Sequence, residues 1–186
     1  MAHPKQLDPE GIVQTAVKLL EEQGLEGLSL RAVAKILGVK APSLYNYFGD
    51  KAALERAVIG EGQRLLLEFV RCRVRSVNEA ETAFREMASA YVKFARRRQA
   101  LYFFVMHHSV PHADATPAGK QIWRILLERV GAITGNGDDT SGAVAVWAFL
   151  HGFAVLEHSG RFGKSGPREG FERGIGALLS GLRIEK

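Results

Sequence analysis

Apolar residues recur along this chain at intervals of three and four, the spacing that places them on one face of an α-helix. The clearest example lies just after residue 29, where one apolar stripe is formed by Leu30, Val33, Ala34 and Leu37. Ser29 can cap the start of this helix, because its hydroxyl can accept a backbone N–H. Gly38 can end it in the left-handed conformation, which glycine adopts without steric cost. We therefore expect a short helix between these two residues.

A second short helix is predicted directly after it. Pro42 suits a first helical turn, where its missing N–H is no loss. Leu44 and Phe48 are four residues apart and can face inward, which leaves the outward positions to Ser43, Asn46 and Tyr47. Two short helices joined by a turn of three or four residues with glycine are the organisation of the DNA-reading helix-turn-helix unit. The pattern therefore predicts a DNA-binding protein.

The same periodicity continues on both sides of this unit and predicts an all-α protein of about nine helices. Asp8-Pro9-Glu10 marks a helix start and Gly24 its end, while Asp50 can cap a long helix that runs to Val74. Further helices are expected over residues 79–97, 100–107, 116–133, 140–159 and 167–182. The segment 140–159 is nearly all apolar or small, so we expect it to be buried on more than one face.

Composition limits the classes of protein that fit. The chain has 186 residues, 46% of them hydrophobic, which suffices for a substantial core. Its only cysteine, Cys72, excludes a disulfide within the chain and is compatible with the cytoplasm. No apolar run reaches the length of about 18 residues that suggests a membrane span. The N-terminus lacks an apolar signal core, so we expect neither export nor a membrane partner.

The charge of the chain fits an anionic partner only locally. The formal net charge is +5, yet residues 1–56 carry seven basic and seven acidic side chains and are neutral in sum. Between Ser29 and Lys51, four basic residues oppose one acid, a local charge of 4 − 1 = +3. Affinity for DNA depends on cations placed at the phosphates and not on the sum over a domain.

Two stretches resemble the tetracycline-repressor (TetR) family of bacterial transcriptional regulators. The first is GVKAPSLYNYFGDKAAL, residues 38–54, and the second is WAFLHGFAVLEHSGRFG, residues 147–163. The second is similar to the helix that gives one effector-domain type its "WHG" name, here Trp147, His151 and Gly152. The resemblance implies a helix-turn-helix DNA-binding domain over residues 1–55 and a ligand-binding and dimerisation domain over residues 56–186. It also implies that the protein is a cytoplasmic regulator and not an enzyme.

The resemblance implies a set of DNA contacts made by Arg31, Lys40, Ala41, Pro42, Ser43, Tyr45, Tyr47 and Lys51. Residues 40–43 would meet base edges or flanking backbone, and Arg31 would reach a base or a phosphate. Tyr45, Tyr47 and Lys51 would hold phosphates. The chemistry agrees, since arginine and lysine donate to guanine or phosphate and tyrosine hydroxyls are common phosphate donors. Lys35 is expected to be a solvated side chain.

The rest of the chain is expected to sense a ligand and to pair with a second copy. The last two helices, residues 140–159 and 167–182, would form a four-helix interface in a homodimer. An unidentified small apolar or aromatic effector would release the repressor from double-stranded operator DNA. Its binding residues are expected among Phe104, His107, Trp123, Trp147 and His151. Within its apolar helix, His151 is otherwise expected to be a buried histidine with its hydrogen bonds satisfied.

The sequence leaves other hypotheses open. His107, His108, His112 and Asp114 suggest a metal site, but no ligand spacing such as HExxH is present, so no metal and no cofactor are expected. The alternatives to a regulator are an all-helical metal-dependent enzyme and a helical ligand-binding protein that does not touch DNA. The arginine runs at residues 71–75 and 96–98 are expected to complement helix C-termini and to stay in solvent.

Overall fold

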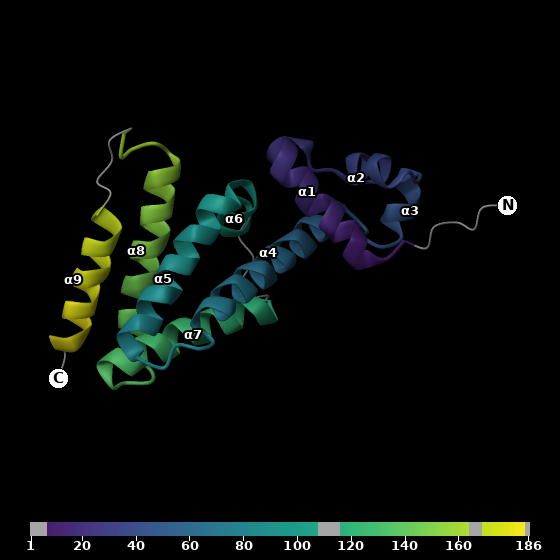
Figure 1. The fold of residues 1–186 in the computed structure, drawn as a ribbon. Coiled ribbons are helices and arrows are strands. Elements are labelled where there is room, and N and C mark those ends of the chain that lie inside the picture. The colour runs from purple at the N-terminus through teal and green to yellow at the C-terminus, as the bar shows by residue number, and fades with distance from the viewer. Residues whose placement is uncertain (1–6, 108–115, 164–168, 185–186) are drawn as a thin grey trace. The chain divides into compact units, whose positions relative to one another are not determined.

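The only regular secondary structure is helical in the part of the chain that a computed structural model describes, residues 7–107, 116–163 and 169–184 (Figure 1). Among these residues there are nine helices and no strand. They are α1 Pro9–Gly27, α2 Leu30–Leu37, α3 Ala41–Tyr45, α4 Lys51–Val74, α5 Ala80–Arg97, α6 Gln99–His107, α7 Pro117–Thr134, α8 Thr140–His158 and α9 Gly170–Ile184. The all-α prediction is confirmed.

The helices gather into two compact units. Unit 1 comprises the described residues of 1–64 and 98–116, and unit 2 those of 65–97 and 117–186. This division differs from the expected domains 1–55 and 56–186, because α6 packs against α1 and joins the N-terminal helices. The expected domains were defined by function, as a DNA-binding part and a ligand-binding part, and this functional division stays a prediction.

Local capping accounts for where the helices of unit 1 begin. The Asp8 carboxylate accepts the backbone N–H groups of Glu10 and Gly11 at 3.0 and 3.1 Å. Asp50 does the same for the start of α4, accepting the N–H of Ala53 at 2.7 Å. Each cap satisfies donors that a helix start leaves without intrahelical partners. Both predicted caps are confirmed. In α1 the predicted stop is a kink at Gly24, with φ 71° and ψ −172°, and the helix is assigned up to Gly27.

Unit 1 has a core of hydrophobic and aromatic side chains, in which the predicted stripe of α2 takes part. α1 packs on α2 and α6, and α2 packs on α3. The side chains that are at most 3% exposed include Ile12, Leu19, Leu20, Leu30, Val33, Leu44, Leu101 and Tyr102. Because α3 is a single short helix with Leu44 completely buried, its position depends on this anchor.

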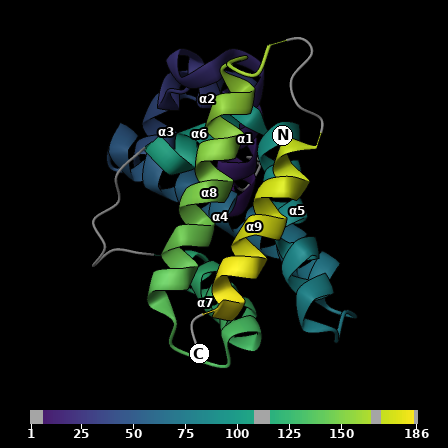
Figure 2. The same cartoon turned by 90° about the vertical axis from the view of Figure 1, so that its left-hand side faces the viewer.

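Unit 2 is organised around α5, which packs on α7, α8 and α9. Figure 2 shows α8 and α9 running side by side, and these two helices also contact each other. The face of α5 predicted to be apolar is buried, as Phe84, Met87, Tyr91 and Phe94 are each at most 5% exposed. The end of α7 leads through a turn to Asp139, whose carboxylate caps α8 by accepting the N–H of Gly142 at 2.8 Å.

Within the single chain, helix α8 is buried along one stripe only, and the expected burial on more than one face stays a prediction. The buried residues are Ala143, Val146, Leu150 and Ala154. Val144, Trp147 and Leu156 are 48%, 45% and 46% exposed within this single chain. The reason is geometric: α5, α7 and α9 cover one side of α8, and no further helix of this unit covers the other. An apolar face of α8 is therefore open to solvent or to a partner.

The composition of α8 corrects the expectation that no apolar run is long enough for a membrane span. Among the described residues, Thr140–His158 has the length and hydropathy that a membrane crossing requires. A single helix of this kind is weak evidence, because core helices of soluble proteins pass the same test.

Candidate nucleic-acid interface

The segment from Ser29 to Phe48 forms two short helices joined by a tight turn. The Ser29 hydroxyl accepts the N–H of Ala32 at 3.1 Å, and this confirms the predicted cap of α2. Gly38 adopts φ 70° and ψ 30°, the left-handed conformation predicted for the end of α2. Leu44 and Phe48 are buried, at 0% and 8% exposure. With these two side chains held in the core, the outer side of α3 is available to a partner.

Most of the predicted DNA-contacting residues are exposed. The exposed ones are Arg31, Lys40, Pro42, Tyr45, Tyr47 and Lys51, whereas Ala41 and Ser43 are partly buried. Lys40 precedes the first residue of α3, and its backbone carbonyl accepts the N–H of Ser43 at 2.9 Å. All eight residues lie in α2, α3, the residues around them and the first position of α4. Their contacts with DNA stay a prediction.

Tyr45 and Tyr47 present large aromatic rings to solvent, at 46% and 43% exposure. The Tyr47 hydroxyl donates a hydrogen bond to the backbone carbonyl of Leu7 at 2.9 Å. A phenolic hydroxyl has one hydrogen to donate. In this structure the hydrogen of Tyr47 therefore points to Leu7, and donation to a phosphate would require exchanging this bond. Sequence reasoning missed this contact, because nothing in the local pattern links residues forty positions apart.

Lys51 occupies the first position of α4 with its side chain 54% exposed. Its Nζ lies 3.5 Å from Oε1 of Glu55, one turn along the helix. A cation at a helix N-terminus is electrostatically unfavourable, because the helix dipole places positive charge there. An exposed ion pair of this kind contributes little to stability. Folding alone gives little reason for a lysine at this position, and the contact of Lys51 with DNA stays a prediction.

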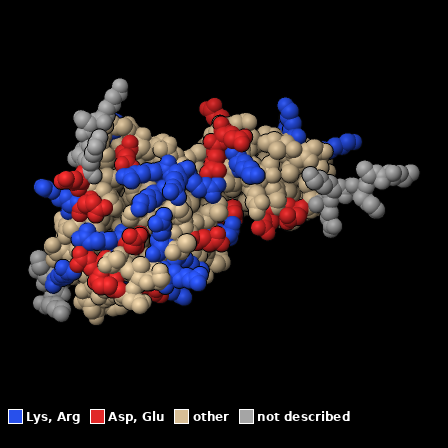
Figure 3. Space-filling view, viewed as in Figure 1, with Lys and Arg blue, Asp and Glu red and all other residues tan. Residues whose placement is uncertain are grey.

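The arginine run at residues 96–98 also suggests nucleic-acid binding, but two of its arginines form ion pairs within the protein. In unit 1, Arg98 makes a bidentate pair with Glu21 at 2.7 and 2.8 Å. In unit 2, Arg96 makes the same kind of pair with Glu157 at 2.6 and 2.8 Å. These hydrogen bonds raise the pKa of both guanidinium groups. Figure 3 shows basic side chains gathered over the face of unit 2 in view, with acidic ones between them.

The predicted effector-binding residues are divided between the units. In unit 1, Phe104 is buried in α6, and the exposed His107 has its Nδ1 2.9 Å from the Phe103 carbonyl oxygen. In unit 2, Trp123 and Trp147 meet edge to face with ring centroids 6.2 Å apart. The indole N–H of Trp147 donates to the Tyr91 hydroxyl at 3.3 Å. Tyr91 is a polar member of this group that the sequence pattern assigned to the core.

His151 is half-buried on α8, so the expectation of a buried histidine is wrong. The buried stripe of α8 passes through Leu150 and Ala154, and His151 lies beside this stripe.

The predicted metal site is not described by the structure, since three of its four residues, His108, His112 and Asp114, lie outside the described part of the chain. Within that part, no group of three or more His, Cys, Asp and Glu side chains is arranged to hold a metal ion.

Comparison with protein families assigns both halves of the chain. Residues 12–58 match the model of bacterial regulatory proteins of the tetR family, and residues 84–178 match the tetracyclin repressor-like C-terminal domain. The HTH-type transcriptional regulator Rv0681 of Mycobacterium tuberculosis is 29% identical, over 86% of this chain and 74% of that protein. The class A tetracycline repressor of Escherichia coli from transposon 1721 is 27% identical, over 95% of this chain and 90% of that protein.

Solved structures agree with this assignment at the level of the fold. A protein of unknown function from Rhodococcus sp. RHA1 is 25% identical and superposes with a TM-score of 0.82, covering 98% of this chain and all of that one. BioQ in complex with its natural double-stranded DNA operator is 23% identical, with a TM-score of 0.70 over 96% of this chain and 99% of that one. The chain belongs to the TetR family of bacterial transcriptional regulators, and its N-terminal helix-turn-helix is the DNA-binding element.

Proposed function

We propose that this TetR-family chain is a homodimeric repressor that leaves its operator when a small apolar or aromatic effector binds. The observation that carries the DNA-binding part is the outer surface of the α2–α3 unit. Leu44 and Phe48 anchor α3 from within, while Arg31, Lys40 and both tyrosines are exposed around it. In this proposal residues 1–55 read DNA, and residues 56–186 bind the effector and form the dimer.

Each exposed group is assigned a role by its chemistry. Lys40 and Arg31 donate to base edges or flanking phosphates, and Tyr45, Tyr47 and Lys51 hold phosphates. Ala41 offers only a methyl group, so its contact would be apolar, for example with a thymine methyl. Pro42 and Ser43 complete the surface that faces the bases or the backbone. Sequence preference would then rest mainly on Lys40 and Arg31.

Selection from a pool of random DNA duplexes tests this assignment. Wild-type protein should enrich an inverted repeat whose half-sites are separated by whole turns of the double helix. Arg31→Ala should weaken the preference at defined positions of each half-site, by about 1–3 kcal/mol if the guanidinium reads a base. Lys35→Ala is the matched control, because it removes a charge from the same helix at a side chain assigned to solvent. Enrichment of no common sequence by the wild type would refute the proposal.

The homodimer is proposed to form through α8 and α9. The open face of α8 carries Val144 and Leu156, which water covers in the single chain, and the part-exposed Trp147 lies at the edge of this face beside Trp123 and Tyr91. Small residues beside them, Ala145 and Ala148, would let a symmetry-related helix approach closely. A twofold interface of this kind buries the same face on both copies. We also propose that the chain has a WHG-type effector domain, in which Trp147, His151 and Gly152 form the motif.

Sedimentation velocity tests the dimer. Val144→Glu should convert the dimer to a monomer, because a carboxylate buried opposite apolar groups has no partner. Ser76→Glu is the matched control, since it introduces the same charge at an exposed position of the α4–α5 connection. A wild-type protein that sediments as a monomer at micromolar concentration would contradict the proposal, as would a Val144→Glu variant that remains dimeric.

The effector is proposed to contact the aromatic group of Trp123, Trp147 and Tyr91, with Phe104, His107 and His151 as the other candidate residues. Apolar walls with a few polar groups are typical of small-molecule sites. An effector can release DNA only if it binds the DNA-incompetent state more tightly. A screen of aromatic compounds for loss of operator binding, repeated on Trp123→Ala, tests this. Compounds that act equally on both proteins would contradict the assignment.

The two alternative functions have direct tests. Stoichiometric zinc or iron in the purified protein would favour the metal-dependent enzyme. Failure to bind any duplex at low salt would favour the ligand-binding protein without DNA. The proposal places the protein in the cytoplasm, where its operator DNA lies, with no cofactor and no membrane partner.

A further inference from the structure

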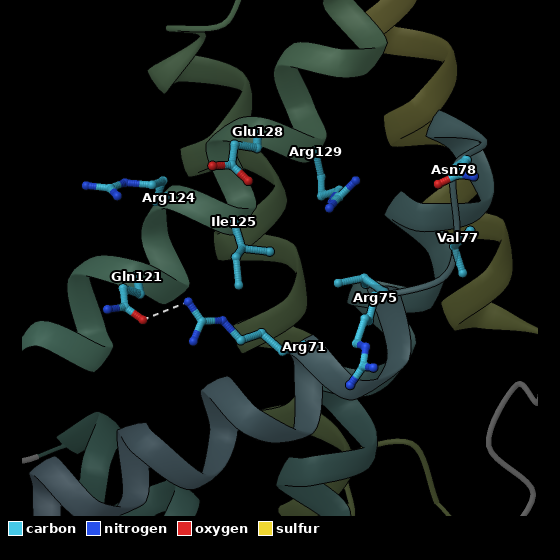
Figure 4. Close-up of a pocket in the computed structure, with 10 residues that line it drawn as sticks. Arg71, Arg75, Val77, Asn78, Gln121, Arg124, Ile125, Glu128 and Arg129 are labelled. Carbon is cyan, nitrogen blue, oxygen red and sulfur yellow. Dashed lines mark hydrogen bonds between the residues drawn. The ribbon is translucent and has the colours of Figure 1, made fainter.

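Unit 2 contains a hollow of about 650 Å³ at the end of α4, beside the α4–α5 connection and α7. It is lined by Arg71, Val74, Arg75, Val77, Asn78, Gln121, Arg124, Ile125, Glu128 and Arg129. Figure 4 shows the side chains of Arg71, Ile125 and Arg129 reaching into the space between the helices, whereas Arg124 extends away from it. The volume lies within the range of small-molecule sites, about 300–1,000 Å³.

The lining is strongly basic. It includes Arg71, Arg75, Arg124 and Arg129 against the single carboxylate of Glu128, and without Arg124, whose side chain extends away from the space in Figure 4, the sum is 3 − 1 = +2. The Nη2 of Arg71 donates a hydrogen bond to the amide oxygen of Gln121 at 2.8 Å, and this partner carries no charge that would neutralise the guanidinium. Like charges crowded around one hollow repel each other, and a bound anion would relieve this repulsion.

Arg129 is a second arginine of the lining, and the environment of its guanidinium is unusual. Its Nε is buried and has no hydrogen-bond acceptor among the residues that the structure describes. Leaving a buried polar group without a partner is costly, and such groups in native proteins usually have one. The side chain points into the same hollow as Arg71 (Figure 4). Because Nε itself is covered, an acceptor in the hollow could reach it only if the Arg129 side chain moved, and the place of this side chain in the lining is what supports a ligand.

We propose that this hollow binds a small organic anion that carries at least two carboxylate or phosphate charges and a short apolar part. Arg71 and Arg129 would hold the charged groups, because the planar guanidinium matches both carboxylate and phosphate geometry. Val74, Val77 and Ile125 would contact the apolar part. None of the five predicted effector-binding residues lines this hollow, and the inference does not depend on DNA binding.

Isothermal titration of the full chain with two probes, citrate and pyrophosphate, tests the site. At least one probe should bind with one site per chain and a dissociation constant of about 1 mM or lower. Arg71→Gln and Arg129→Gln should each weaken that binding by about tenfold or more, the size expected for a lost hydrogen bond to a charged group. Arg161→Gln, which removes an exposed charge of the same unit away from the hollow, should bind like the wild type.

Each possible result of these titrations either supports the proposed anion site or overturns it. Preference for citrate assigns a carboxylate ligand, and preference for pyrophosphate assigns a phosphate ligand. Arg71 is exposed, so Arg71→Gln carries the test even if Arg129→Gln does not fold. Absence of saturable binding of either probe, or an equal loss in Arg161→Gln, would overturn the proposal. Loss of non-specific duplex binding in Arg71→Gln without any binding of either probe would overturn it in favour of a nucleic-acid contact.

Discussion

Replacement of Lys51 by alanine separates a DNA-contacting lysine from a structural one. Its ammonium group lies at the first position of α4, is 54% exposed and has Glu55 as an ion-pair partner at 3.5 Å. Loss of an exposed pair of this spacing costs about 0.3–0.5 kcal/mol. Removal of a cation from a helix N-terminus returns about 0.3–1 kcal/mol. The folding stability of Lys51→Ala should therefore stay close to that of the wild type.

The effect on DNA binding should be much larger than the effect on folding. Each lysine that neutralises a phosphate adds about 0.9 to the slope of log affinity against log salt. A dimer presents this residue twice, so Lys51→Ala should reduce the slope by about 1.8. Over a fourfold rise in salt, from about 0.05 to 0.2 M, the variant should lose about tenfold less affinity than the wild type.

Fluorescence anisotropy of a labelled operator duplex, measured across this salt range, gives both slopes. Lys35→Ala serves as the control, because it removes one exposed lysine of the same unit that is not assigned a phosphate. Thermal unfolding of both variants checks that neither loses its fold. An unchanged salt slope for Lys51→Ala would refute the phosphate assignment, and so would an equal reduction in both variants.

Two further predictions concern the stability of the fold. Gly38→Ala should lower the free energy of unfolding by about 1–2 kcal/mol, because φ at Gly38 is +70°. The control is Gly49→Ala in the turn before α4, which should be neutral or slightly stabilising, because Gly49 has no positive φ and nothing lies within 4 Å of an added Cβ. Equal losses of stability for the two variants in urea unfolding would contradict this. Hydrogen bonds from Arg85 and Arg183 lower the pKa of Glu81 from its ordinary value of 4.5. The ionised carboxylate therefore stabilises the fold above pH 4.5, and this stabilisation is lost as the pH falls through the lowered pKa of the folded protein. The stability difference between wild type and Glu81→Gln should therefore be present at neutral pH and shrink below pH 4.5; a pH-independent difference would refute the ionic origin.

The helix-turn-helix could be predicted closely because its signals are local. A capping serine, an apolar stripe and a glycine at a left-handed position act within a few residues of each other, and the structure has all three at Ser29 to Gly38. The anchors Leu44 and Phe48 follow from a spacing of four. Such patterns are sufficient wherever short-range geometry decides the conformation.

Other features could not be predicted, because they depend on which faces meet. The single buried stripe of α8 follows from the packing of α5, α7 and α9 on one side, and an apolar composition cannot show this. The half-buried position of His151 has the same cause. The contact between Tyr47 and Leu7 joins distant parts of the sequence. The arginine-lined hollow collects residues from two helices and a connection, so the run at residues 71–75 resembled an ordinary solvated helix end.

The measurement that tests the central claim most directly is a titration of the wild-type chain with the DNA upstream of its own gene. A scrambled duplex of the same length and composition serves as the competitor, at a fixed salt concentration near 0.15 M. We predict one dimer per upstream duplex and a preference of about a thousandfold or more over the scrambled duplex, the range of specific regulators. Equal affinity for both duplexes, or no binding to either, would contradict the assignment of α2 and α3 as the DNA-reading unit of this protein.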